Sequence, residues 1–110
     1  MKGTNLGEFE ELVLLTIAVL VNDAYSVAIC DELEKSLKRP AKLGVVHAVL
    51  NRLEEKGYVK SKLGEATNAR GGKRKRYYAV TNGGKAALTR TRELRDQLWN
   101  RIPELMLKKA

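Results

Sequence analysis

The spacing of apolar residues changes twice along the chain, and this change restricts the fold more than any other feature of the sequence. Up to residue 56, apolar side chains recur every three or four positions, which predicts α-helices. Over residues 58–63 and 74–80 they alternate with polar side chains, which predicts two strands. The helical spacing returns after residue 81. The order of three helices, a hairpin and a final helix predicts a mostly α fold of the α+β class.

Residues that favour helix ends mark the boundaries of these helices. Thr4 or Asn5 can cap the first helix, and Gly57 stands where a C-terminal glycine would end the third. Thr81 is a suitable N-cap for the last helix, whereas Pro103 predicts a kink or an early end within it. The expected ranges of the first three helices are 7–21, 26–37 and 43–56.

The third helix has two faces of different chemistry. Its apolar face is expected to enter the core and consists of Val46, Val49, Leu50 and Leu53. On the opposite face, Gly44 and Ala48 leave room for another molecule to approach, while His47 and Asn51 can hydrogen-bond to base edges or phosphates. Lys42 at the N-terminal end of the helix and Arg52 on its flank can bind phosphates. The first helix, by contrast, is apolar all round and is expected to be covered on most sides.

Basic residues are concentrated in the second half of the chain. The net charge is +8 over 110 residues, but residues 1–41 carry −3, residues 42–80 carry +7 and residues 81–110 carry +4. The middle part includes an unbroken run of four basic residues at 73–76. A solvated basic surface is one explanation. The unbroken run favours an anionic partner, for which nucleic acid is the first candidate.

The order of three helices and a basic hairpin is that of a winged helix-turn-helix. In that fold the third helix enters the major groove, and the hairpin, or wing, reaches phosphates or the minor groove. The wing residues expected to contact DNA are Arg70, Lys73, Arg74, Lys75 and Arg76. The alternative is that these charges only protect the edges of the hairpin from pairing with other chains. The sequence therefore predicts a module that binds double-stranded DNA.

The last helix carries a narrow apolar stripe that its own domain has little left to cover. The stripe consists of Ala87, Thr91, Leu94, Leu98, Ile102 and Leu105. Packing against a second copy of the chain would bury it, whereas the alternative is folding back onto the first helix. We therefore expect residues 1–80 to form the DNA-binding domain, and residues 81–110 to form a dimerisation helix within the same compact unit.

Other classes of protein fit this sequence less well. One histidine, one cysteine and no glycine-rich phosphate loop argue against an enzyme, and no cofactor or metal is expected. The apolar run at 12–21 is about half the length of a membrane span. The single Cys30 and the lack of a signal-peptide pattern suit the cytoplasm. A winged helix that binds RNA or protein is the remaining alternative, although RNA binding favours exposed aromatic residues and protein binding needs no basic wing.

Three segments resemble the PadR-like transcriptional regulators. They read LGEFEELVLLTIAVL, GVVHAVLNRLEEKGYV and GGKRKRYYAVTNGGKAAL, and the resemblance covers about residues 6–88. It implies a winged-helix homodimer that acts as a repressor and dimerises through the C-terminal helix, often together with the N-terminal helix. The short C-terminus resembles the subgroup with a single final helix.

The resemblance also has implications for specificity and for ligands. Family members usually open the recognition helix with Gly-Thr-Leu-Tyr-Pro, but residues 44–48 here read Gly-Val-Val-His-Ala. His47 thus stands where the family places a DNA-contacting tyrosine, so a different operator is expected. Members often sense small aromatic molecules at the dimer interface, which implies an effector site lined by Trp99 and Leu98. The alternative is that Trp99 only packs at that interface.

Overall fold

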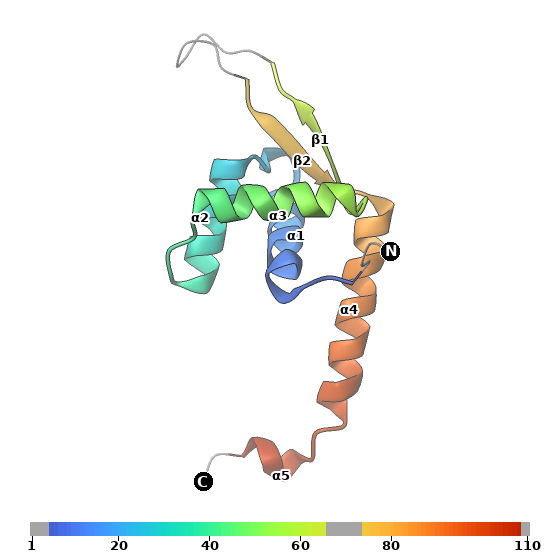
Figure 1. Ribbon diagram of the computed structural model, residues 1–110. Helices are drawn as coiled ribbons and strands as arrows, with labels where there is room; N and C mark the ends of the chain where they lie inside the picture. Colours follow the sequence, from blue (N-terminus) through green and yellow to red (C-terminus); the bar gives the residue numbers. More distant parts are fainter. Residues whose placement is uncertain (1–4, 66–73, 109–110) are drawn as a thin grey trace.

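The structure is a computed structural model that describes residues 5–65 and 74–108. Three helices pack together, a two-stranded hairpin extends from one side of them, and a long helix leads away to a short last one (Figure 1). The elements are α1 (Glu8–Leu20), the 3₁₀ turn η1 (Val21–Asp23), α2 (Ser26–Leu37), α3 (Leu43–Glu55), β1 (Val59–Leu63), β2 (Arg76–Val80), α4 (Asn82–Asn100) and α5 (Glu104–Leu107). This is the predicted order, and each of the first three helices lies within one residue of its predicted range.

The core lies between α1, α2 and α3. Its largest fully buried side chains are Val13, Leu14 and Ile17 from α1, Ile29 and Leu33 from α2, and Val46, Val49, Leu50 and Leu53 from α3. The prediction for the apolar face of α3 is therefore confirmed. As expected, α1 is covered on most sides, but Leu15 and Val19 are exposed in the single chain.

The strands β1 and β2 form an antiparallel hairpin. Val59 pairs with Val80 at its base, and Leu63 pairs with Arg76 at its outer end. The second strand was predicted from residue 74, but it begins at Arg76, so the two basic residues before it are not strand residues. Their side chains consequently need not alternate between the two faces of the hairpin as strand residues do.

The segment before α2 is hydrogen-bonded to the second strand of the wing. Tyr25 forms an isolated antiparallel bridge with Tyr77, and the N–H of Tyr78 donates to the carbonyl of Ala24 over 2.8 Å. The sequence predicted only the two strands of the hairpin, because this third contact joins parts of the chain that are far apart. Tyr78 is buried, so the wing is attached to the helical core through its own second strand.

The end of α3, the base of the wing and the start of α4 meet in one joint. Gly57 ends α3 with φ = 78°, as its position predicted. Thr81 is the N-cap of α4: its hydroxyl accepts from the N–H of Gly84 over 3.1 Å and donates to the carbonyl of Gly57 over 2.6 Å. Gly84 lies so close to Tyr58 that an added Cβ would stand 2.2 Å from the Tyr58 carbonyl oxygen.

We expect Gly84→Ala to lower the free energy of unfolding by about 2 kcal/mol, because the backbone at Tyr58 must shift to admit the methyl group. Gly83→Ala is the matched control, since its Cβ would meet the nearest backbone oxygen, that of Gly57, at 3.3 Å. Urea unfolding of both variants measures the difference. Equal stability of the two variants would show that the joint accommodates a side chain at Gly84.

The N-terminus of α1 differs from its prediction. Gly7 is the N-cap, not Thr4 or Asn5, and Thr4 lies outside the described residues. The N–H of Gly7 donates to Oε1 of Glu10 over 2.7 Å, so a carboxylate three residues into the helix performs the capping. At the other end of the chain, α4 ends at Asn100 and Pro103 caps α5, which confirms the break predicted from the proline. Among the described residues, no helix is long and apolar enough to span a membrane.

Candidate nucleic-acid interface

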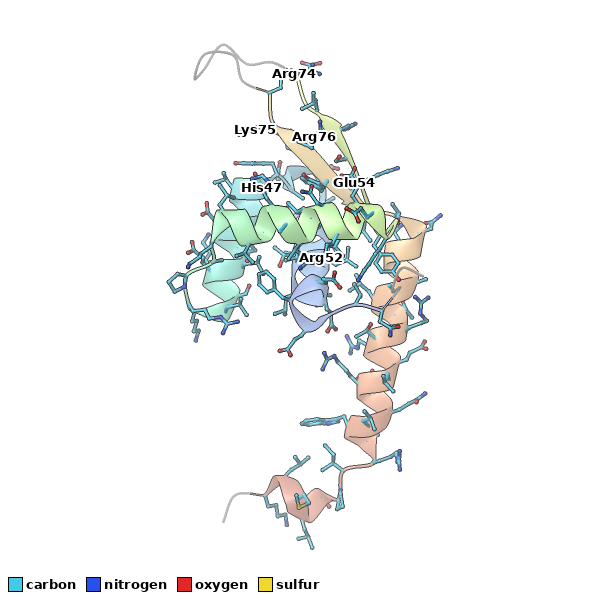
Figure 2. The ribbon with its side chains drawn as sticks, in the orientation of Figure 1. His47, Arg52, Glu54, Arg74, Lys75 and Arg76 are labelled. Atoms are coloured by element: carbon cyan, nitrogen blue, oxygen red, sulfur yellow. The ribbon has the colours of Figure 1, made fainter. Side chains whose placement is uncertain are left out.

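The outer face of α3 carries the side chains expected to enter the major groove. His47, Ala48 and Asn51 are exposed, and a Cβ added at Gly44 would meet no described atom within 4 Å. His47 lies on the side of α3 from which the wing rises (Figure 2). Lys42 is exposed at the N-cap, where its ammonium group can reach a phosphate. The structure therefore brings five of the six predicted α3 residues onto one accessible surface.

Two apolar residues of this helix were missed as candidates. Leu43 and Val45, in the first turn of α3, are both exposed. Apolar side chains at such positions can contact the methyl group of thymine in the major groove. Their signal in the sequence was their place outside the apolar stripe that fills the core.

Arg52 is the predicted α3 residue that lies apart from the others. Its Nε is 3.3 Å from Oε2 of Glu10 in α1, and its side chain is 54% exposed. Figure 2 shows it on the side of α3 opposite to His47. Arg52 thus joins α3 to α1, and its phosphate contact stays a prediction.

Glu10 of α1 forms ion pairs with two basic residues, Arg52 and Lys56. Its side chain is only 8% exposed, and it accepts hydrogen bonds from Lys56 Nζ over 2.8 Å, from the N–H of Gly7 and from Arg52. Burial alone would raise the pKa of this carboxyl, but the hydrogen bonds and charge of Lys56, together with the other donors, outweigh it and hold the pKa below its ordinary value. Glu10 is therefore a carboxylate that fixes α3 to α1.

Two of the five predicted wing residues, Arg70 and Lys73, lie outside the described residues. Of the others, Arg74 is exposed and its Nε donates to the carbonyl of Gly64 over 2.7 Å, which closes the outer end of the hairpin. Arg76 is also exposed and donates from Nη1 to Oγ of Ser61 over 3.1 Å. Each guanidinium keeps further N–H groups that can bind phosphate.

Lys75 has a different environment from its two neighbours. Its ammonium group lies 4.1 Å from the centre of the Tyr25 ring, a cation–π contact. The Tyr25 ring in turn packs edge-on against Tyr77, with the ring centres 5.7 Å apart. Lys75 therefore lies against the Tyr25 ring, and it must leave this contact if it is to extend toward a phosphate.

The first strand of the wing supplies two basic residues that the site prediction omitted. Lys60 and Lys62 are exposed, and Lys62 pairs with Tyr77 across the hairpin, so both lysines lie on the face of Tyr77. Arg76 lies on the other face, since its partner Leu63 follows Lys62 by one residue. The wing thus presents positive charge on both faces. The alternation of lysine with other residues over 59–63 was the signal available in the sequence.

The predicted dimer stripe extends past the end of α4. On α4 lie Ala87, Thr91, Leu94 and Leu98, whereas Ile102 lies between the two helices and Leu105 lies on α5. Ala87 is buried within the chain, but Leu94, Leu98 and Leu105 are more than half exposed. One hollow beside α4 is lined by Leu6, Ala87, Thr91, Leu94 and Leu98. A second hollow is lined by Arg95, Asp96, Leu98, Trp99 and Ile102, and the effector site at Leu98 and Trp99 stays a prediction.

Comparison with protein families decides which class of winged helix this is. Residues 14–90 match the model of the transcriptional regulator PadR-like family. The chain belongs to the PadR-like family. No curated protein matches this PadR-like chain.

Solved structures of PadR-like regulators share the fold. One from Bacillus cereus is 17% identical with a TM-score of 0.71, and the match covers 92% of this chain and 93% of that one. One from Clostridium difficile is 28% identical with a TM-score of 0.63, covering 91% and 95%. One from Bacteroides fragilis is 19% identical with a TM-score of 0.67, covering 86% and 85%. The PadR-like fold therefore extends over nearly the whole described chain.

Proposed function

We propose that this PadR-like protein is a homodimeric repressor that binds specific sites in double-stranded DNA. The observation that carries the proposal is the exposed face of α3 beside a basic wing, in a chain that belongs to a family of transcriptional regulators. On this proposal His47 and Asn51 read base edges, and Lys42 and Arg74 bind phosphates. Gly44 and Ala48 let the backbone of α3 approach the bases.

The exposed apolar side chains of α4 support the dimer. Leu94 and Leu98 are more than half exposed in the single chain, and an apolar surface of this kind is a common mark of a protein interface. On the first helix, Leu15 and Val19 are exposed as well, which suits a partner helix that packs against α1 and α4 together. A two-fold dimer would place two recognition helices on related half-sites and double the phosphate contacts.

The repressor role and the effector rest on the family. Occupation of an operator by the dimer would block access to the promoter, and such a protein works in the cytoplasm with neither enzymatic activity nor a cofactor. A small aromatic molecule would bind in the hollow beside Leu98 and Trp99 and change the distance between the two recognition helices. The competing role for Trp99, packing against the partner copy, predicts no response to such a ligand.

Fluorescence anisotropy of a labelled duplex tests the proposal. The duplex comes from the region upstream of the gene itself, a scrambled duplex serves as the control, and both are titrated over a series of salt concentrations. Non-specific binding at physiological salt has a Kd of about 10⁻⁴–10⁻⁶ M, and specific sites bind about a thousandfold more tightly or better. A preference for the upstream duplex would support a specific regulator. Binding to neither duplex at low salt would overturn the proposal and favour a protein or RNA partner.

We expect Arg74→Ala to weaken binding to both duplexes and to reduce the salt slope by about one, because it removes one phosphate contact without reading sequence. Arg101→Ala is the matched control, since it removes the same charge at the end of α4, away from the wing. Salt titrations of the two variants by anisotropy provide the comparison. An unchanged slope for Arg74→Ala would exclude this side chain from the interface.

A further inference from the structure

A carboxylate of the recognition helix is hydrogen-bonded to the wing. Glu54 lies in the last turn of α3, and its Oε2 accepts from Oγ of Ser61 on β1 over 2.8 Å. The same Ser61 oxygen accepts from Nη1 of Arg76 on β2 over 3.1 Å. Figure 2 shows Glu54 on the side of α3 from which the wing rises. One chain of hydrogen bonds thus runs from the recognition helix through both strands of the wing.

The register of the hairpin explains why these three groups meet. Ser61 pairs with Tyr78, so Arg76 is its diagonal neighbour on the same face. Tyr78, the partner of Ser61 across the hairpin, is buried. Burial raises the pKa of Tyr78, the charge of Glu54 raises it further, and the charge of Arg76 lowers it. The charges of Glu54 and Arg76 therefore both influence Tyr78, whose backbone N–H joins the wing to Ala24.

Glu54 carries a negative charge, which is unfavourable on a helix that binds DNA. A carboxylate on a helix that approaches DNA repels the phosphates, so on electrostatic grounds alone its removal should strengthen binding. The hydrogen bond of Glu54 to Ser61 can offset this repulsion of the phosphates by holding the wing in place. The orientation of the wing matters because it decides whether the basic residues of the wing reach the DNA backbone while α3 occupies the major groove.

We propose that Glu54 is a positioning residue which, through Ser61 and Arg76, fixes the tilt of the wing against α3. The inference rests on the DNA-binding function proposed above. Glu54 itself touches no DNA in this role. It keeps the two DNA-contacting elements at one relative angle, so that both bind without a further loss of conformational freedom on association.

Two substitutions of the same residue separate positioning from charge. Glu54→Gln and Glu54→Ala remove the same negative charge, but only glutamine keeps an oxygen that accepts from Ser61. For Glu54→Ala we expect roughly fivefold weaker binding to the upstream duplex and a smaller salt slope, as expected for the loss of one net hydrogen bond and of wing contacts. For Glu54→Gln we expect binding equal to or tighter than that of the natural chain. Equal or tighter binding by both variants would overturn the proposal.

Ser61→Ala removes the middle of the chain of hydrogen bonds. If the three groups act together, the double variant Glu54→Ala/Ser61→Ala will bind no more weakly than either single variant, since coupled residues are not additive. Additive losses would contradict a shared role. Circular dichroism of each variant checks that the fold is kept.

A measurement without DNA separates this inference from the proposed function. Backbone amide order parameters from NMR of the free protein should fall in β1 and β2 for Glu54→Ala and stay unchanged for Glu54→Gln. If the natural chain prefers no duplex, the DNA-binding function fails while this measurement still tests the positioning of the wing. Rigid strands in Glu54→Ala would overturn the inference even where DNA binding is established.

Discussion

Replacing Leu98 by glutamate is expected to give a folded monomer that binds its operator about a hundredfold more weakly or worse. Leu98 is 55% exposed in the single chain, so the fold of one protomer does not depend on it. In a dimer its side chain would be buried, and a carboxylate there would be unpaired in an apolar interface. A monomer loses the second half-site, and linking two binding modules often multiplies affinity by about 10²–10⁴.

Analytical ultracentrifugation measures the association, and anisotropy measures the loss of affinity. Asn100→Glu is the matched control, because it adds the same charge two residues further along α4 and outside the apolar stripe. It should leave both the association and the affinity close to those of the natural chain. A Leu98→Glu variant that still sediments as a dimer would remove Leu98 from the interface and would favour a partner face elsewhere.

We expect Glu10→Ala to destabilise the protein by about 3 kcal/mol, since it removes one partner of a largely buried ion pair and leaves Lys56 without the carboxylate it binds. Urea unfolding at pH 7 measures the change. Glu8→Ala removes a carboxylate from the same helical turn at an exposed position, and it should cost only a few tenths of a kcal/mol. Similar losses for the two variants would mean that the Glu10 cluster contributes little.

The stabilising effect of Glu10 should also depend on pH. Because its pKa is lowered in the folded chain, its contribution is fully present above the ordinary value of 4.5 and is lost as the pH falls through the lowered folded value. The difference in stability between the natural chain and Glu10→Ala should therefore be largest near neutral pH and should shrink in acid. Unfolding curves at pH 7 and near pH 3 provide the comparison. A difference that stays constant between the two would contradict this linkage.

Local signals explain what the sequence could predict about the fold. The bounds of the first three helices follow from side-chain spacing. Gly57 marks the end of α3 and Thr81 marks the start of α4, and each of these boundaries depends only on that residue and its immediate neighbours. The predicted N-cap of α1 was wrong, because the residue at that position is Gly7 and not Thr4 or Asn5. The N–H of Gly7 donates to the side chain of Glu10, which no helix-end signal in the sequence indicated.

The candidate interface was predictable in its composition but not in its contacts. The exposed face of α3, including His47, follows from the helical period. The pairing of Arg52 with Glu10 joins residues 42 positions apart, and the contact of Lys75 with Tyr25 likewise crosses elements. No periodic pattern contains such pairs. They depend on how the helices and the wing pack, so the sequence could not show that Arg52 and Lys75 each have a contact within the chain. Their contacts with DNA stay predictions.

The joint between α3, the wing and α4 has a mechanical consequence. Thr81 holds the start of α4 to the last residue of the turn after α3, and Gly84 packs against the backbone there. α4 has 19 residues and is therefore a lever roughly 28 Å long. A rotation of about 5° at the joint would move the far end of such a lever by about 2.5 Å. In a dimer assembled along α4, the spacing of half-sites would be set by the few atoms at Gly57, Thr81 and Gly84, far from any base they help to select.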